Sequence, residues 1–282
     1  MSLPSGAWFI TGASTGLGRA LAEALLAGGQ NVVATARRIE SVQDLEDRYP
    51  KSARAFRLDV VDRASIGGVV ATAAEAFGGI DVVVNNAGYS LIGAFEEFGI
   101  QQVRDLFETN FFGAWAVTQT ILPIMRTRGA GTIVNISSQG GIAGMPGTAA
   151  YSASKFALEG MSEALEAEVV AFGLRVLIVE PGPFRTAMRR SLQIPERRID
   201  DYPDYGGTLR RQDGDQVGDP SLAAAAIIAA VTAPEPPLRL VLGASAVAVV
   251  RKKLNRASAD LVAWEATSIA TAFADESGEN TR

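Results

Sequence analysis

The segment Thr11-Gly12-Ala13-Ser14-Thr15-Gly16-Leu17-Gly18 follows a short apolar run and leads directly into an Ala/Leu-rich helical pattern. Glycines at such a turn let the backbone N–H groups of a helix N-terminus approach a phosphate, whose negative charge the helix dipole stabilises. The spacing G-x-x-x-G-x-G differs from the G-x-G-x-x-G of the better-known dinucleotide fingerprint. The segment therefore predicts a dinucleotide-binding strand-turn-helix unit, and an ordinary turn that binds no ligand is the alternative.

Around this segment the chain alternates short β-branched runs with helical stretches, a pattern typical of βαβ units and a parallel sheet. The expected strands are 7–11, 31–35, 53–58, 81–85, 131–136, 175–180 and 238–242. The expected helices are roughly 17–28, 40–48, 63–77, 101–128, 152–172 and 221–232. A chain of 282 residues suits one doubly wound α/β domain, so we expect a single domain over 1–282 with about seven parallel strands.

One stretch in the C-terminal third departs from this alternation. About forty residues between Pro181 and Pro220 carry Pro, Gly, Tyr and mixed charge without periodicity. Structureless stretches of this length in compact domains are usually lids or binding loops. We therefore expect a substrate lid over 184–219, and a disordered surface insertion is the alternative.

A second departure follows Gly243, where apolar residues recur at spacings of three and four. This spacing predicts one long amphipathic helix over 245–272. The apolar stripe consists of Val247, Val250, Leu254, Ala257, Leu261 and Trp264. We expect this stripe to pack in the core or at a subunit interface.

The composition excludes several kinds of chemistry. The chain has no Cys and no His, so it offers no disulfide, no thiolate, no histidine metal site and no Ser-His pair. A formal net charge of -5 argues against a nucleic-acid partner, and the longest apolar run, 222–231, is about half of a membrane span. We expect a cytoplasmic protein without a metal, whose acids and bases are Tyr, Lys, Asp or Glu.

The segment Tyr151-Ser152-Ala153-Ser154-Lys155 supplies a candidate acid and base. Residues i and i+4 share a helix face, so the Lys155 ammonium can lie near the Tyr151 phenol and favour the phenolate. A surface tyrosine beside a solvated lysine gives the same spacing, so the pair alone is weak evidence. Its position adds weight, because Ser137 and Ser138 end a predicted strand shortly before this helix, and ligands bind at the ends of parallel strands.

In order and approximate spacing, these motifs resemble the short-chain dehydrogenase/reductase family. The motifs that carry the resemblance are the segment 11–18, Asn85-Asn86-Ala87-Gly88, Asn110, Ser138 and Tyr151-x-x-x-Lys155. The resemblance implies a Rossmann-type sheet with the cofactor-binding and catalytic core over 5–187. It is weaker in the lid and the C-terminal helix, which vary among such enzymes.

The resemblance implies a role for each catalytic candidate. Tyr151 would be the general acid that protonates a carbonyl oxygen, or the base of the reverse reaction. Lys155 would lower the pKa of that phenol and hydrogen-bond the nicotinamide ribose. Ser138 would hold the substrate oxygen, with Ser137 structural. Asn110 would kink its helix and hold a water that links the lysine to solvent; a helix-interior Asn bonded to its own backbone is the alternative.

Cofactor contacts are implied in the same way. The expected set comprises Gly12, Ser14, Thr15, Gly16, Leu17, Gly18, Arg37, Arg38, Asp59, Val60, Asn86, Ala87, Gly88, Tyr151, Lys155, Pro181, Gly182 and Thr186. The segment 86–88 would support the adenosine ribose and the sheet, and the segment 181–186 would hold the nicotinamide carboxamide. Asp59 and Val60 would meet the adenine edge, with a plain turn aspartate as the alternative.

The end of the second expected strand bears on the choice of cofactor. Ala36 stands where NAD enzymes usually place an acidic residue that accepts from the ribose 2′-hydroxyl, and Arg37 and Arg38 suit a 2′-phosphate. We therefore expect NADP(H), with use of NAD(H) left open. Thr15 stands where some NADP-dependent relatives carry a basic residue, and two arginines that are merely solvated are the alternative.

The expected function is reversible hydride transfer between NADP(H) and a carbonyl or secondary alcohol of a largely apolar small molecule. The apolar character is inferred from Tyr89, Leu91, Ile142, Met145, Phe184 and the tyrosines of the expected lid. An NAD-dependent alcohol dehydrogenase of the same fold and a non-catalytic NADP(H)-sensing protein are the alternatives. Relatives pair the helices near 101–128 and 152–172 across a two-fold axis, so we expect a homodimer or homotetramer.

Overall fold

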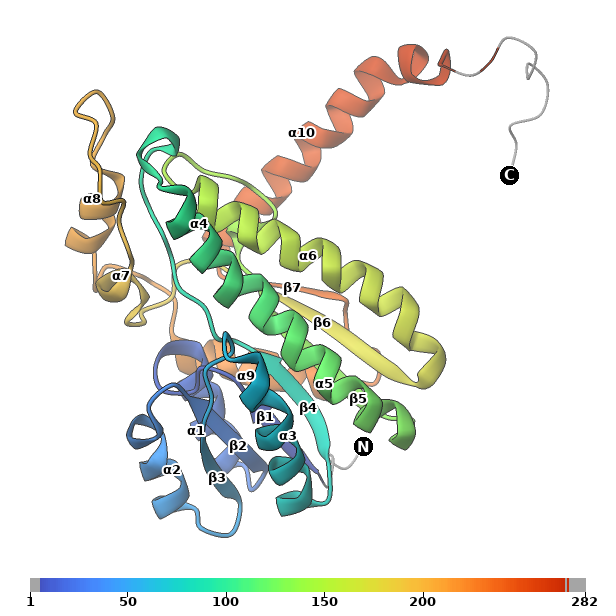
Figure 1. Cartoon of the computed structure of the whole chain (residues 1–282). Helices are drawn as coiled ribbons and strands as arrows, with labels where there is room; N and C mark the ends of the chain where they lie inside the picture. Colours follow the sequence, from blue (N-terminus) through green and yellow to red (C-terminus); the bar gives the residue numbers. More distant parts are fainter. Residues whose placement is uncertain (1–5, 272, 274–282) are drawn as a thin grey trace.

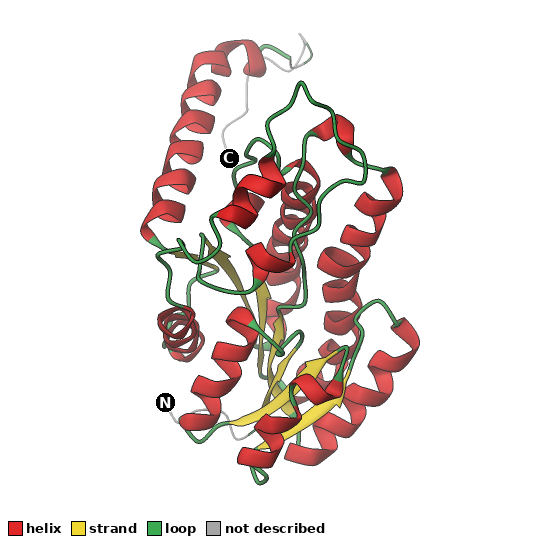
Figure 2. Cartoon of the chain, turned by 90° about the vertical axis from the view of Figure 1, so that its left-hand side faces the viewer, coloured by secondary structure: helices red, strands yellow, loops and turns green. Residues whose placement is uncertain are grey.

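The computed structural model describes residues 6–271 and residue 273. Seven parallel strands form one sheet in the order β3-β2-β1-β4-β5-β6-β7, with helices on both faces (Figures 1 and 2). The strands are β1 (Ala7–Ile10), β2 (Asn31–Ala36), β3 (Ala53–Arg57), β4 (Ile80–Asn85), β5 (Gly131–Ile136), β6 (Leu174–Pro181) and β7 (Arg239–Leu242). The expected doubly wound sheet is confirmed, and every expected strand is present with bounds within one residue of the prediction. The order reverses between β1 and β4, so their carboxyl ends form the switch point where such sheets bind ligands.

Two apolar cores hold the helices against the sheet. One core packs α1, α2 and α9 onto one face, and it includes Leu21 and Ile227. The other packs α3, α5 and α6 onto the opposite face, and it includes Val70, Ile121 and Val169. The helices are α1 (Gly16–Ala27), α2 (Gln43–Arg48), α3 (Arg63–Phe77), α4 (Ile100–Phe107), α5 (Gly113–Arg128), α6 (Ala149–Val169), α7 (Met188–Ser191), α8 (Tyr205–Arg211), α9 (Pro220–Thr232) and α10 (Ala244–Ile269).

The turn between β1 and α1 is tied to the end of β4. The Thr11 hydroxyl donates to Val84 O and accepts from the backbone N–H groups of Asn86 and Ala87, both at 3.0 Å. The Asn86 amide donates to Thr11 O and Gly12 O, each at 2.9 Å. Gly12 has a φ of 66°, a left-handed conformation that glycine adopts without strain. These bonds fix the glycine turn at the switch point of the sheet.

The helix expected over 101–128 is interrupted, so the prediction of one long helix is wrong. α4 ends at Phe107, a π-helical stretch covers Glu108–Phe112, and α5 begins at Gly113. A Cβ added to Gly113 would lie 2.6 Å from a Val60 methyl group, so only glycine permits this packing. The extra backbone length of a π turn changes the direction of the side chains within it, and such turns are frequent at functional sites.

The segment expected to be a structureless lid contains regular structure. It includes α7 and α8, and two isolated β-bridges join Leu91 to Gln193 and Phe184 to Gly218. The buried Glu97 carboxylate accepts from the Ile199 N–H at 2.9 Å and so attaches this segment to the body. The expected lack of regular structure is therefore wrong, whereas a lid function stays a prediction.

The C-terminal helix is confirmed as α10, although residue 272 of the expected span lies outside the described residues. We expected its apolar stripe to pack in the core or at a subunit interface, and in this single chain the core alternative does not hold beyond Val250. Within α10, all of which the structure describes, only Ala246 and Val250 are buried. The helix instead extends away from the body of the protein (Figure 1).

The packing of the glycine turn predicts the outcome of one substitution. A Cβ added to Gly18 would lie 2.4 Å from Asn86 Nδ2 and 2.8 Å from Gly12 O. Gly18→Ala should therefore lower the free energy of unfolding by about 1–3 kcal/mol, the usual cost of overpacking. As a control, Gly67→Ala in α3, where no atom lies within 4 Å, should raise it by about 0.5–1 kcal/mol. Urea denaturation followed by circular dichroism measures both, and stabilisation by Gly18→Ala would contradict the close packing.

Candidate functional site

Ser138, Tyr151 and Lys155 come together beyond the carboxyl end of β5. Ser138 follows β5, and its hydroxyl oxygen accepts from the Gly140 N–H at 3.0 Å, which caps a short 3-10 turn. Tyr151 and Lys155 lie one turn apart on α6, and the Lys155 amine is 6.0 Å from the centre of the Tyr151 ring. The amine donates to Ile136 O, in the last residue of β5, at 2.8 Å. The spacing seen in the sequence thus becomes a group of three polar side chains at the sheet edge.

Burial governs the electrostatics of this group. Lys155 is 5% exposed, and loss of solvation lowers the pKa of its amine to about 8, while the negative charge of Glu159 acts in the opposite direction. Burial also raises the pKa of the Tyr151 phenol, although hydrogen bonds with Ser138 and Ser90 favour its ionised form. The Tyr151 pKa therefore lies above its ordinary value, and Lys155, which we expected to lower it, is not among the groups that do so.

Asn110 lies in the π-helical stretch and is buried. Its Nδ2 donates to Tyr89 O at 3.0 Å and to the Ser154 hydroxyl at 3.1 Å, and its Oδ1 accepts from the Tyr89 N–H at 3.0 Å. A Cβ added to Gly88 would lie 3.0 Å from Asn110 Oδ1 and 3.7 Å from Lys155 Nζ. Asn110 thus connects the loop after β4 to α6 beside Lys155, through bonds that leave its own helix.

A charged cluster beneath the site was not predicted from the sequence. Arg239 on β7 lies between two buried carboxylates, with 2.5 Å between its Nη1 and Glu159 Oε2 and 2.6 Å between Nη1 and Glu180 Oε1. Its Nη2 is 2.6 Å from Glu163 Oε1. Burial raises the pKa values of both Glu159 and Glu180. The only signal in the sequence was that Glu159 lies one turn after Lys155 on the same helix face.

The N-terminus of α1 opens onto a cavity of about 420 Å³, whose lining includes Gly16, Arg19 and Thr186. Thr15 makes no side-chain capping bond at this N-terminus, a feature that α1 shares with every α-helix of the described chain except α8 and α9. A helix without a cap leaves backbone N–H donors for water or a ligand. The glycine turn, the bare N–H groups and the helix dipole fit a phosphate group at this place.

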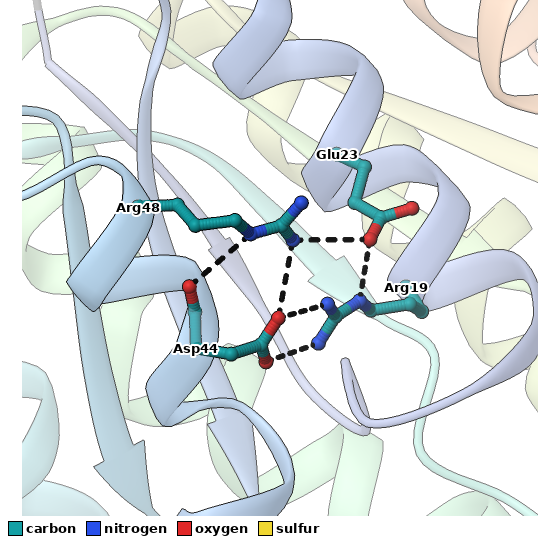
Figure 3. Close-up of polar contacts among 4 residues, drawn as sticks. All are labelled: Arg19, Glu23, Asp44 and Arg48. Carbon is teal, nitrogen blue, oxygen red and sulfur yellow. Dashed lines mark hydrogen bonds and ion pairs between the residues drawn. The ribbon is translucent and has the colours of Figure 1, made fainter.

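Arg19, which follows the glycine turn, belongs to a network of four charged side chains (Figure 3). Its guanidinium pairs with both carboxylate oxygens of Asp44, at 2.8 and 2.5 Å, and with Glu23 at 2.9 Å. Arg48 pairs with the same two carboxylates. The Arg19 hydrogen bonds lower the pKa of the Asp44 carboxyl. The network joins α1 to α2 and neutralises Arg19, a residue that the sequence analysis did not single out.

The other cofactor candidates are distributed along the same edge of the sheet. Arg37 and Arg38 follow β2 and are exposed. Burial raises the pKa of the Tyr89 phenol, and the positive charge of Arg37 lowers it by a smaller amount. Asp59 Oδ1 accepts from the Val61 N–H at 3.1 Å, the contact that a plain turn aspartate makes. Gly16 lies beside Thr186, because a Cβ added to Gly16 would be 3.4 Å from Thr186 Cβ. The turn after β1 and the segment after β6 thus face one another.

Two negative findings concern the described residues alone. Among residues 6–271 and 273, no group of three or more acidic side chains is arranged to hold a metal ion. No helix in this part of the chain has the length and apolar character needed to cross a membrane.

Comparison with known proteins gives a consistent match. The sequence pattern of the family described as short chain dehydrogenase matches residues 7–197. Oxidoreductase BOA17 of Botryotinia fuckeliana is 38% identical over 271 residues, which cover 94% of this chain and 98% of the relative.

Solved structures extend the match to three dimensions. A short-chain dehydrogenase from Streptomyces avermitilis superposes with a TM-score of 0.87 and 45% identity, covering 96% of this chain and all of the other. A serine dehydrogenase complexed with NADP+ superposes with a TM-score of 0.75 and 27% identity, over 84% of this chain and 94% of the other. Solved neighbours of this fold are described with NAD as well as with NADP.

The buried amine predicts a pH-dependent gain in stability when it is removed. Unfolding returns the Lys155 pKa from about 8 to 10.5, so burial of the charged amine destabilises the fold below pH 8 by about 3 kcal/mol, and this cost disappears by pH 10.5. Lys155→Met should therefore be more stable than the wild type at pH 7 by about 1–2 kcal/mol, after the loss of the hydrogen bond to Ile136 O.

Urea denaturation at pH 7 and pH 10 tests this prediction. The advantage of Lys155→Met should shrink or reverse at pH 10, because the wild-type amine is then neutral in the folded state. Lys252→Met, on the exposed face of α10, controls for the general effect of removing a lysine. Equal stability changes for Lys155→Met at the two pH values would contradict the lowered pKa.

Proposed function

Because the chain belongs to the short-chain dehydrogenase family, we propose that it transfers a hydride reversibly between NADP(H) and a carbonyl or secondary alcohol group. The observation that carries the proposal is the convergence of Ser138, Tyr151 and Lys155 beyond β5, on the same sheet edge as the bare N-terminus of α1. An acid and a substrate-holding hydroxyl beside a dinucleotide site are what reversible reduction of a carbonyl requires.

The chain's own residues would divide the proton chemistry among them. The bound nicotinamide supplies or accepts the hydride. Ser138 would hold the substrate oxygen by a hydrogen bond, and the Tyr151 hydroxyl would give that oxygen a proton during reduction and remove it during oxidation. Burial keeps the Tyr151 phenol protonated, which suits the reductive direction. The Lys155 amine, held by Ile136 O, would position the nicotinamide ribose, and Asn110 would support the loop beside it.

The remaining candidates would bind the dinucleotide. We propose that the pyrophosphate lies at the turn 12–18 and that the segment 86–88 supports the adenosine ribose, next to the bonds between Asn86 and the turn. Asp59 and Val60 would meet the adenine, and Pro181, Gly182 and Thr186 would face the carboxamide end. Arg37 and Arg38 would bind the 2′-phosphate, which is the basis for proposing NADP(H). Their exposure leaves both guanidinium groups accessible to a ligand.

The proposed substrate is a largely apolar small molecule. Ile142 and Met145 are partly exposed in the loop between Ser138 and Tyr151, where they could contact a substrate. Leu91 is fully buried and packs with Leu106, so it belongs to the core and contributes nothing to this inference. We propose that the segment 184–219 closes over the substrate and excludes water from the site.

We also propose that the chain forms a homodimer or homotetramer in the cytoplasm, with α5 and α6 at the interface. Four large apolar side chains on these helices or beside them are exposed: Phe112, Trp115, Phe156 and Phe172. Exposed aromatic side chains gathered on one pair of helices are typical of a subunit interface.

Two other functions compete with this proposal. An NAD-dependent alcohol dehydrogenase would use the same site, and the cofactor preference tests it below. A protein that senses NADP(H) without turnover would need no acid beside the nicotinamide, so the intact set Ser138, Tyr151 and Lys155 favours an enzyme. Turnover of a panel of ketones with NADPH distinguishes an enzyme from a sensor.

Loss of the phenol tests the proposed acid. Tyr151→Phe should lower kcat by at least about 100-fold, the usual contribution of general acid catalysis, while it keeps the fold and NADPH binding. Steady-state kinetics on an active ketone and NADPH fluorescence titration measure the two effects. Tyr49→Phe removes a phenol beyond α2 and serves as the control. Turnover retained by Tyr151→Phe would rule out Tyr151 as the proton donor.

Loss of one guanidinium tests the cofactor preference. A charge-assisted contact contributes about 1.5–3 kcal/mol, so Arg37→Ala should weaken NADPH binding by roughly 10- to 150-fold and leave NADH binding within a few fold. Arg175→Ala, an exposed arginine at the opposite end of the sheet, should change neither affinity. Equal weakening of both dinucleotides by Arg37→Ala would show that Arg37 contacts a part that they share.

A further inference from the structure

The apolar stripe on α10 is largely exposed to solvent in the single chain. Beyond Val250, the stripe residues Leu254, Leu261 and Trp264 are 58%, 67% and 65% exposed. In Figure 1 the helix extends beyond the rest of the molecule. Burial of a large apolar side chain stabilises by about 1.5–3 kcal/mol, so a helix of this kind gains substantially from a partner.

The spacing of the stripe specifies the kind of partner. The residues Val247, Val250, Leu254, Ala257, Leu261 and Trp264 alternate steps of three and four without exception. Such a seam over three heptads is the pattern of a helix that packs against another helix in a coiled coil. The fitting partner is therefore a second helix with a seam of the same length.

The charged residues beside the seam distinguish an antiparallel from a parallel pair of α10 helices. Lys253 and Asp260 occupy the same heptad position beside the seam, seven residues apart. In an antiparallel pair centred between Leu254 and Ala257, Lys253 lies beside Asp260 of the partner subunit, and the same contact repeats across the two-fold axis. A parallel pair would instead place Asp260 beside Glu265 of the partner subunit, where like charges repel.

The same antiparallel register gives Trp264 a place to bind. At the base of α10 lies a groove of about 240 Å³ lined by Val241, Val247, Val250, Arg251, Leu254 and Asn255. In this register Val247, which lines the groove, lies opposite Trp264 of the partner subunit. The groove is mainly apolar, and Arg251 can cover the face of an indole ring, a favourable cation–π arrangement.

We propose that α10 is a self-association arm, which pairs antiparallel with α10 of a second copy so that each Trp264 fills the groove at the base of the other helix. The arm is separate from the interface proposed on α5 and α6 and does not depend on the proposed activity. Both contacts together would build a tetramer from two dimers.

Cysteine cross-linking tests the register, because the chain has no cysteine of its own. In the variant Lys253→Cys/Asp260→Cys, seven residues separate the thiols by about 10 Å along one helix, too far for a bond within the chain. Oxidation should therefore give a covalent dimer. The control Lys252→Cys/Ala259→Cys has the same spacing on the outer face and should stay monomeric on a denaturing gel. Equal cross-linking of the two variants, or of neither, would overturn the proposal.

A charge exchange tests the energetics in the native assembly. Lys253→Asp should raise the dissociation constant of the arm contact by at least about fivefold, and Lys253→Asp/Asp260→Lys should restore it, because the ion pairs then form with reversed signs. Lys252→Asp makes the same charge change on the outer face and should have no effect. Sedimentation velocity over a concentration series measures all four proteins. An unchanged mass distribution in Lys253→Asp, or an equal shift in Lys252→Asp, would overturn the proposal.

Discussion

The close approach of the turn after β1 to the end of β4 is the constraint on which the rest of the candidate site depends. A Cβ added to Gly12 would lie 2.9 Å from Ala87 Cα, and Asn86 bonds the turn from the other side. No larger residue fits without a shift of one strand end. This contact sets where α1 begins, and therefore where its bare N–H groups point relative to β4 and β5. The proposed phosphate site and the Tyr151 group lie at the same edge of the sheet, because β4 pairs in parallel with both β1 and β5.

The site accepts buried charge that an ordinary core would exclude. Lys155 is almost fully buried, and among the described residues its amine has one hydrogen-bond partner, the carbonyl oxygen of Ile136, so its charged form is destabilised. The Glu159 carboxylate on the next turn opposes this effect, and Arg239 in turn compensates Glu159 and Glu180. A series of alternating charges thus runs from the buried amine to the partly exposed Arg239. Removal of Arg239 would leave the buried carboxylates Glu159 and Glu180 without this cationic partner, which is more costly than the absence of the whole set.

The sequence was sufficient for the parts of the fold that rest on local patterns. All seven strands were predicted within one residue, because each apolar run is short and bounded by polar or glycine residues. Local patterns also predicted Tyr151, Lys155 and Ser138. The first two lie four residues apart on one helix, and Ser138 follows the end of a strand. The π turn at 108–112 was not predicted, because no local pattern in the sequence distinguishes it from the α-helical residues on either side. The Arg239 cluster and the Arg19–Asp44 pair join distant elements, and no local pattern marks such contacts.

The stripe on α10 illustrates a different limit of sequence reasoning. A heptad seam indicates that a helix buries one face. It does not indicate whether the surface that covers this face comes from the same chain or from another chain. Among the residues that the structure describes, no segment of the same chain covers most of the seam, because α10 is buried only at Ala246 and Val250, near its base. That base lies against the candidate site: a Cβ added to Gly182, after β6, would be 3.2 Å from Ala246 Cβ. The arm proposed on α10 and the segment proposed to hold the carboxamide are therefore in contact through Ala246 and Gly182.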